Sequence, residues 1–285
     1  LWQNVREFLD EEFPEAAMVS EWGEPDKSLQ GGFHMDFLLH FGPSHYNDLF
    51  RCDAPFFAGN GDASEFVKKY MENYEKSERK GLICIPSGNH DMDRLERSIK
   101  GDNLKIAFAF LMSVPGAPFI YYGDEIGMRY VENLTSVEGG YDRTGSRSPM
   151  QWDKTLNAGF SLASPEKLYI KQDESDDRPD AESQIADENS LYNEIRKLIS
   201  IRRSHSALGN NSEIEFIYAE KNEYPLAFIR SSEDEKILVI INPADREVSF
   251  PCEYKPKEAV YSFGREISYE DKKITVPPCS AGFYR

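Results

Sequence analysis

The chain has 285 residues and a formal net charge of −17 at neutral pH. So acidic a chain lacks the clustered Lys and Arg that bind a nucleic-acid backbone or an anionic membrane, and neither partner is expected. Hydrophobic residues make up 40% of the chain, enough for a core, and the length suggests about two domains. The longest apolar stretch, residues 104–114, is too short to cross a bilayer.

The N-terminal segment, residues 1–13, is amphipathic from the start, with Val5, Phe8 and Leu9 at helical spacing. Pro14 ends this predicted helix. The segment does not resemble a signal peptide. We therefore expect a chain that begins inside a helix of something longer, and a cytoplasmic location.

The first part of the chain alternates short apolar runs with helical patterns. The runs that predict buried strands are 16–21, 33–41, 82–86 and 118–122. The helical patterns between them include one behind the capping-box pattern at 62–65, with Phe66, Tyr70 and Tyr74 on one face, and one at 102–113. This βα rhythm is typical of a parallel sheet with helices outside. A loop-rich region, 128–186, and an amphipathic helix at 190–203 follow.

After Gly209 the period changes, and short strand-like segments are punctuated by Gly, Pro, Asn and Ser. They lie at 214–218, 226–229, 237–241, 247–250, 259–263 and 273–276. This pattern predicts an antiparallel β-sandwich. We therefore divide the chain into an α/β domain, residues 1–208, and an all-β domain, residues 209–285.

The four cysteines show neither a CxxC spacing nor the rhythm of a metal site; they are Cys52, Cys84, Cys252 and Cys279. We expect reduced, structural thiols, with a Cys252–Cys279 bridge as the alternative. No metal and no cofactor is expected.

Two carboxylates, Glu21 and Asp91, follow predicted parallel strands. In α/β barrels the carboxyl ends of the strands carry the chemistry. Cleavage of a glycosidic bond needs an acid that protonates the leaving oxygen and negative charge that faces an oxocarbenium-like centre. Two alternatives are structural: Glu21 is a buried, salt-bridged carboxylate, or Asp91 is the N-cap of the next helix.

Three motifs carry a family resemblance. The segment 87–94, Ser-Gly-Asn-His-Asp-Met-Asp-Arg, resembles the Asn-His-Asp motif after the seventh barrel strand of the α-amylase family of glycoside hydrolases. The segment 115–128 is similar to the eighth strand of that family and its exit. Residues 147–153, Arg-Ser-Pro-Met-Gln-Trp-Asp, resemble the branch of oligo-1,6-glucosidases, α-glucosidases and trehalose synthases.

The resemblance implies roles for five residues. Glu21 matches the general acid/base after the fifth strand, although Trp22 departs from the usual pattern. Asp91 matches the carboxylate that stabilises the transition state, and His90 an imidazole that binds the same sugar. Arg94 and Arg147 match arginines that shape the sugar subsites, and a loop-anchoring ion pair is the alternative for Arg147.

Other conspicuous side chains are expected to be structural. The resemblance implies this for Asp124 and Glu125, and no motif supports Asp36, His34 or His40. Tyr121, Tyr122 and Trp152 are expected to pack rather than to face a sugar.

The resemblance also implies a missing part, because the nucleophile of the family is an Asp in a Gly-Phe-Arg-x-Asp block that this sequence lacks. The implied fold is α/β: the C-terminal half of a TIM (β/α)8 barrel, strands 5–8, followed by an all-β sandwich. The implied function is part of a retaining glycoside hydrolase of short α-glucosides or α-glucans. The alternatives are a trehalose-synthase-like α-glucosyl isomerase or transferase, and a non-catalytic binding relative. The expected partners are an α-glucoside or α-glucan oligosaccharide, and the N-terminal half or a second copy at the exposed sheet edges.

Overall fold

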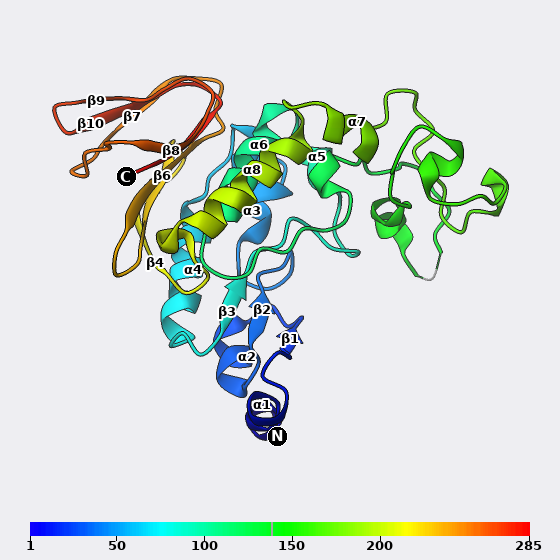
Figure 1. The fold of residues 1–285 in the computed structure, drawn as a ribbon, viewed down its shortest axis with the longest axis horizontal. Coiled ribbons are helices and arrows are strands. Elements are labelled where there is room, and N and C mark those ends of the chain that lie inside the picture. The colour runs from blue at the N-terminus through cyan, green and yellow to red at the C-terminus, as the bar shows by residue number, and fades with distance from the viewer. Residues whose placement is uncertain (138) are drawn as a thin grey trace.

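The computed structural model describes residues 1–137 and 139–285. Figure 1 shows parallel strands with flanking helices, a loop-rich excursion, and two antiparallel sheets at the C-terminal end of the chain. The α-helices are α1 (Trp2–Glu12), α2 (Pro25–Gly31), α3 (Tyr46–Phe50), α4 (Ser64–Lys76), α5 (Leu95–Ser98), α6 (Asp102–Ser113), α7 (Ala181–Ala186) and α8 (Leu191–Ser204). Of the helices described, none is both long and apolar enough to traverse a membrane.

The parallel sheet contains β1 (Val19–Ser20), β2 (Met35–Phe37) and β3 (Leu82–Cys84), in that order. A single parallel bridge, Pro86 to Phe119, extends it where a fourth strand at 118–122 is predicted. Only one bridge forms where a fourth strand is predicted because Pro86 and Pro118 have no N–H to donate to a neighbouring strand. The Ser87 N–H still donates to the Phe119 carbonyl at 2.9 Å, so the chain order of the sheet is as predicted.

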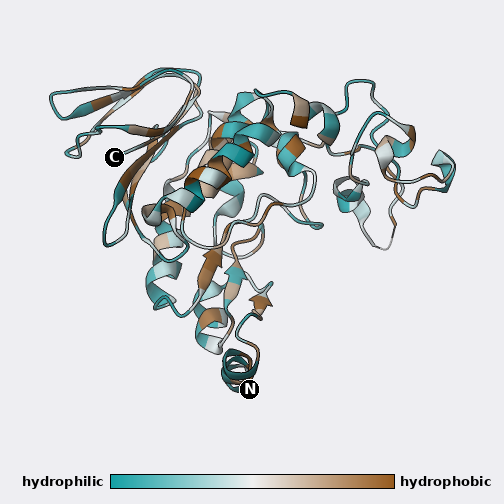
Figure 2. Ribbon diagram, viewed as in Figure 1, coloured by the Kyte–Doolittle hydropathy of each residue, from teal (hydrophilic) through white to brown (hydrophobic). Residues whose placement is uncertain are grey.

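Helix α6 lies at the centre of the core, and its bounds agree with the prediction. It is buried from Ile106 to Ser113, and it packs beside α8. The Phe110 ring contacts rings from three other segments: Phe57 at 5.4 Å, and Phe66 and Phe228 at 6.2 Å between centroids. In Figure 2 hydrophobic residues colour β1, β3 and much of the centre of the molecule, whereas α1 is mostly hydrophilic.

The antiparallel strands form two sheets. The five-stranded sheet has the order β4-β5-β6-β11-β8, and the three-stranded sheet the order β7-β10-β9. The strands are β4 (Glu213–Tyr218), β5 (Leu226–Ser231), β6 (Lys236–Asn242), β7 (Val248–Pro251), β8 (Ala259–Phe263), β9 (Ser268–Glu270), β10 (Lys273–Val276) and β11 (Ser280–Tyr284).

Strands β9 and β11 are absent from the predicted set, although β11 pairs with both β6 and β8. Its Ser-Ala-Gly start has low strand propensity. A Cβ at Gly282 would lie 2.3 Å from the Tyr284 hydroxyl oxygen, so any larger residue there would have to displace the Tyr284 ring. At this position packing between neighbours, rather than strand propensity, favours glycine.

The five-stranded sheet is buried on both faces. On one face, Leu238 and Ile240 share a core with Phe250 and Ile274 of the three-stranded sheet. On the other face, side chains that include Phe228 and Val239 share a core with α6. The continuous apolar run of β6 is the sequence mark of a strand covered on both sides.

Two buried arginines hold the C-terminal end of α6. Arg202 of α8 donates to the carbonyls of Met112 at 2.9 Å, Val114 at 2.7 Å and Gly116 at 2.6 Å. Arg230 of β5 donates to the Ser113 carbonyl and, at 2.6 Å, to that of Gly209. Burial lowers the pKa of Arg202 to about 10 and that of Arg230 to about 9, and both stay charged at neutral pH.

All four cysteines are within the described residues and are unpaired, so the Cys252–Cys279 alternative is wrong.

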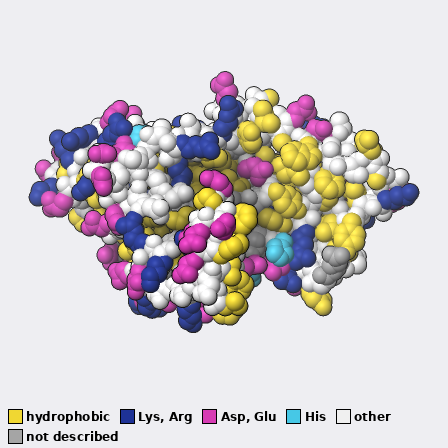
Figure 3. Space-filling model, turned by 60° about the horizontal axis from the view of Figure 1, so that its bottom comes forward, with side chains coloured by type: hydrophobic (Ala, Val, Ile, Leu, Met, Phe, Trp, Pro, Cys, Tyr) yellow, Lys and Arg dark blue, Asp and Glu magenta, His cyan; other side chains and the backbone are white. Residues whose placement is uncertain are grey.

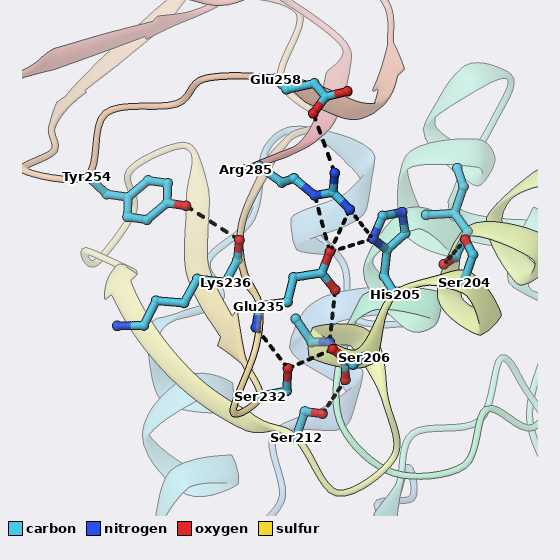
Figure 4. A network of polar contacts seen from close by, with 12 residues as sticks. Ser204, His205, Ser206, Ser212, Ser232, Glu235, Lys236, Tyr254, Glu258 and Arg285 are labelled. Carbon is cyan, nitrogen blue, oxygen red and sulfur yellow. Dashed lines mark hydrogen bonds and ion pairs between the residues drawn. The ribbon is translucent and has the colours of Figure 1, made fainter.

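A smaller polar network joins the end of α8 to the antiparallel sheet (Figure 4). The Glu235 carboxylate lies 2.7 Å from His205 Nδ1 and 3.0 Å from Arg285 Nη2, and it accepts the Ala207 N–H at 3.2 Å. Burial alone would raise the pKa of Glu235, but hydrogen bonds from these three groups together hold it below its usual value. The charged form of Glu235 is therefore favoured by folding.

Replacement of Arg230 by Leu is expected to lower the free energy of unfolding by at least about 3 kcal/mol, because several buried carbonyls lose their donor. Urea denaturation at neutral pH measures the change. The exposed Arg265 is the matched control, and Arg265→Leu is expected to change the stability by less than about 0.5 kcal/mol. Equal effects of the two substitutions would contradict the role of Arg230.

Replacement of Glu235 by Gln is expected to reduce stability by about 1–2 kcal/mol at pH 7. A carboxyl group with a lowered folded-state pKa stabilises above its unfolded pKa, and this contribution disappears as the pH falls through the folded-state pKa. The difference between wild type and Glu235→Gln should therefore begin to shrink as the pH falls below the usual Glu pKa of about 4.3, and it should disappear once the pH is below the folded-state pKa. Thermal unfolding between pH 3 and 8 measures it, and a difference that is constant with pH would refute this account.

Candidate active site

The first strand end carries Glu21, which directly follows β1 and is exposed. The buried carboxylate of Asp36 on β2 fixes this turn, since it accepts the Trp22 N–H at 3.1 Å and the Ser28 hydroxyl at 2.6 Å. Glu21 makes no ion pair within the described part of the chain. The alternative of a buried, salt-bridged Glu21 is therefore wrong.

The second strand end carries Asn89, His90 and Asp91 on a turn after β3. The Asp91 N–H donates to Asn89 Oδ1 at 2.8 Å, which closes the turn. Asn89 Nδ2 donates to Glu21 Oε1 at 3.4 Å, so the two strand ends meet. The next helix, α5, has Arg94 at its N-cap, and the alternative of Asp91 as the helix cap is wrong.

Two arginines of the segment η3 (Tyr141–Arg147) hold the Asp91 carboxylate. Arg143 Nη1 lies 2.8 Å and Arg147 Nη2 lies 2.9 Å from Asp91 Oδ1. Arg147 also donates through Nε to the His90 carbonyl at 2.8 Å. Arg147 therefore anchors the loop and lies at the carboxylate. Arg143 is not in the predicted set, and its only signal is its place four residues before Arg147.

The His90 ring is exposed, and its Nε2 lies 3.6 Å from Asp91 Oδ1. Arg94, by contrast, is 1% exposed. Its guanidinium donates to the Tyr122 carbonyl and lies 4.7 Å from the ring centroids of Tyr121 and Tyr122. The structure thus places Arg94 beneath the site, where it supports the two tyrosines and has no open path to a ligand.

Asp124 lies beside Arg94 and is buried. Burial raises the pKa of Asp124, while the Arg94 charge and the Ser87 hydroxyl, which donates at 2.7 Å, favour its charged form. This environment fits the structural role expected for Asp124.

A concavity of about 280 Å³ opens between the two strand ends. Its lining combines an apolar floor with a polar rim and consists of Glu21, Phe37, Leu39, Pro86, Gly88, Asn89, His90, Phe119, Ile120 and Tyr121. Such linings are typical of small-molecule sites. Figure 3 shows a face on which hydrophobic, basic, acidic and His side chains lie close together.

Tyr121 and Tyr122 pack as expected, against each other at 4.7 Å between ring centroids and on Arg94, although Tyr121 also lines the concavity. Trp152 differs from the expectation, because it is 52% exposed. No cluster of three or more His, Cys, Asp or Glu side chains suited to a metal ion occurs among residues 1–137 and 139–285.

The sequence matches two known domain families. Residues 1–211 match the family model of the α-amylase catalytic domain, and residues 214–281 that of the maltogenic amylase C-terminal domain. The structure agrees with both family matches. It has a parallel βα sheet whose carboxyl ends meet at a polar concavity, and a β-sheet domain follows. The chain belongs to the α-amylase family, and the predicted resemblance is confirmed.

Several known proteins are similar in sequence. An oligo-1,6-glucosidase of Parageobacillus thermoglucosidasius is 27% identical over 259 residues, which are 77% of this chain and 45% of that protein. A probable α-glucosidase of Rhizobium meliloti is 25% identical over 292 residues, 96% of this chain and 51% of that protein. A trehalose synthase/amylase of Mycobacterium tuberculosis is 34% identical over 151 residues, 51% of this chain and 24% of that protein. The chain spans about half the length of the first two.

Solved structures show the same fold. The trehalulose synthase MutB from Pseudomonas mesoacidophila MX-45 aligns with a TM-score of 0.78 and 21% identity, over 99% of this chain and 57% of that chain. An α-amylase from H. orenii aligns with a TM-score of 0.74 and 22% identity, over 99% and 55% of the two chains. A partial α-amylase-type barrel with a β-sheet domain is therefore confirmed, and its assignment to strands 5–8 remains a prediction.

Proposed function

We propose that this chain is part of a retaining glycoside hydrolase that acts on the α-glucosidic bonds of short α-glucosides or α-glucans. In this proposal Glu21 is the general acid/base, Asp91 stabilises the transition state, and His90 and Arg147 contribute to the sugar subsite. Arg94 does not contact the sugar in this proposal; it lies beneath the concavity and holds Tyr121 and Tyr122 in place. We also propose that residues 1–208 form part of the catalytic domain and that residues 209–285 form a separate all-β domain.

The observation that carries the proposal is the contact between Asn89 and Glu21 across the concavity. It brings an exposed carboxyl group on one strand end beside the turn that holds a second carboxylate. Acid catalysis at a glycosidic oxygen and stabilisation of a cationic sugar need two such groups close to one sugar. Glu21 lines the concavity, and Asp91 directly follows His90, which also lines it.

The proposed chemistry has two steps. Protonated Glu21 gives its proton to the glycosidic oxygen as the C1–O bond breaks, and an aspartate nucleophile forms an ester with C1. The Glu21 carboxylate then takes a proton from water or a sugar hydroxyl, whose oxygen attacks C1 and releases the aspartate. The negative charge of Asp91 faces the sugar while positive charge develops at C1.

The nucleophile, in this proposal, comes from a segment outside this chain. Glu21 contributes the one carboxylate among the described residues that line the concavity. Asp91 is held by two guanidinium groups, which suits a stabilising role better than that of a free nucleophile. The isolated chain should therefore give no turnover.

A glucosyl isomerase is the second candidate. The similarity to a trehalose synthase/amylase, 34% identity over 151 residues, favours it. In that case the released glucose stays in the site and its hydroxyl, rather than water, attacks the intermediate.

Activity of the whole protein that carries this chain tests the proposal. Glu21→Gln and Asp91→Asn should each lower kcat/KM on maltose or isomaltose by about 10³-fold or more, because each removes a group used in the transition state. The matched controls are Glu24→Gln and Asp93→Asn, which remove neighbouring carboxylates that have no role in the proposed chemistry. Product analysis separates glucose from trehalose, and wild-type activity of both site variants would rule out the assignment.

We further propose that another polypeptide segment covers the open edge at Phe119. A groove of about 780 Å³ lies beside it, with Met112, Pro118, Ile120 and Ile199 in its lining. Unpaired strands with apolar neighbours favour association. The isolated chain should therefore sediment as a self-associated species, whereas the N-terminal half of the barrel should return it to a defined one-to-one complex. A well-folded monomer at all concentrations would contradict this proposal.

A further inference from the structure

The turn that carries Asn89, His90 and Asp91 rests on the guanidinium group of Arg51. Arg51 directly follows α3 and is partly buried. Its Nη2 donates to the Ser87 carbonyl at 2.6 Å, and its Nε donates to the Asp93 carbonyl at 2.9 Å. Ser87 precedes the three site residues and Asp93 follows them. One planar group therefore bridges both ends of the turn.

Arg51 is itself held in place by Tyr46. Arg51 Nη1 donates to the Tyr46 hydroxyl at 2.8 Å, and that hydroxyl donates to the Pro86 carbonyl at 2.7 Å. The Tyr46 side chain is buried, and burial raises its pKa to about 12, so the hydroxyl keeps its proton. The three nitrogen atoms of the guanidinium group thus each have a fixed acceptor.

Gly88 shows how closely the turn lies on this group. A Cβ at Gly88 would lie 3.0 Å from Arg51 Nη2 and 3.0 Å from Asp124 Oδ2. A side chain larger than that of glycine would therefore press on the guanidinium group and on Asp124. Displacement of either partner would shift the residues that follow.

The neighbouring Arg97 makes a different set of contacts. Its guanidinium pairs with the side chains of Asp93 at 2.9 Å and Glu132 at 3.0 Å. Within the described residues, the Arg97 side chain makes no hydrogen bond with a carbonyl of the turn. It is therefore a matched arginine close to the same turn.

We propose that Arg51 is a positioning residue for the site. It sets the conformation of the turn and hence the directions in which His90 and Asp91 face a sugar. This inference rests on the proposed function. A lysine cannot replace Arg51, because one ammonium group cannot reproduce the fork that binds both carbonyls.

The first measurement is amide hydrogen exchange of the 285-residue chain. Arg51→Gln and Arg51→Lys should speed exchange of the Asp91 and Met92 amides by about tenfold or more, with core amides of α6 unchanged. Arg97→Gln should change the same amides by less than about twofold. Methylguanidinium added to Arg51→Ala should restore part of the protection. Uniform loosening of the whole chain, or unchanged turn amides, would overturn the proposal.

The second measurement is binding of 1-deoxynojirimycin, a cationic glucose mimic, to the whole protein that carries this chain, followed by chemical shifts of the turn amides. Wild type and Arg97→Gln should bind alike, and both Arg51 variants at least about tenfold more weakly. Wild-type affinity in Arg51→Lys would overturn the inference and leave the proposed function intact. No binding by wild type, together with a loosened turn in the Arg51 variants, would count against the proposed function while the positioning of the turn stands.

In the whole protein, Arg51→Lys should lower kcat more than it raises KM, since Asp91 acts on the transition state. A change in KM alone would contradict a role in placing Asp91.

Discussion

The C-terminal end of α6 is the point on which the arrangement of the chain depends. The carbonyls of a helix end lack partners within the helix, and here they are buried. Arg202 from α8 and Arg230 from β5 supply the donors, so three distant segments converge on one helix end. Neither guanidinium forms an ion pair with a carboxylate among the described residues. The carbonyl oxygens and the negative end of the helix dipole therefore stabilise their charge.

This junction also locates the site. The segment after α6 passes through Gly116, whose carbonyl Arg202 binds, to Phe119, which bridges to Pro86 beside the turn of Asn89, His90 and Asp91. The antiparallel sheet reaches the same helix end through Arg230. Packing of the β-rich part thus fixes the path of the chain into the concavity, although none of its residues lines that concavity.

The sequence predicts those features of the fold and the site whose defining residues are close together in the chain. Helix α6 and strand β6 are predicted well because their apolar residues are consecutive and signal burial by themselves. The meeting of Glu21 with Asn89 follows from two strand ends in one parallel sheet. Strand β11 and the roles of Arg143 and Arg51 are not predicted, because their partners are distant in the chain. The strand partners of β11 lie 18 or more residues away, and the turn groups that the two arginines bind lie 36 or more residues away. An arginine in a loop gives no local sign of the carbonyls that it will bind.

The ion pairs of Arg143 and Arg147 with Asp91 make the site sensitive to the salt concentration of the solution. These side chains are 41%, 22% and 28% exposed, respectively, so dissolved ions reach them. Mobile ions screen such charges over a Debye length of about 8 Å at physiological ionic strength and about 3 Å in 1 M salt. Ionic strength therefore acts directly on the attachment of η3 to the turn. The shape of the surface around Asp91 therefore depends on the salt concentration as well as on the fold.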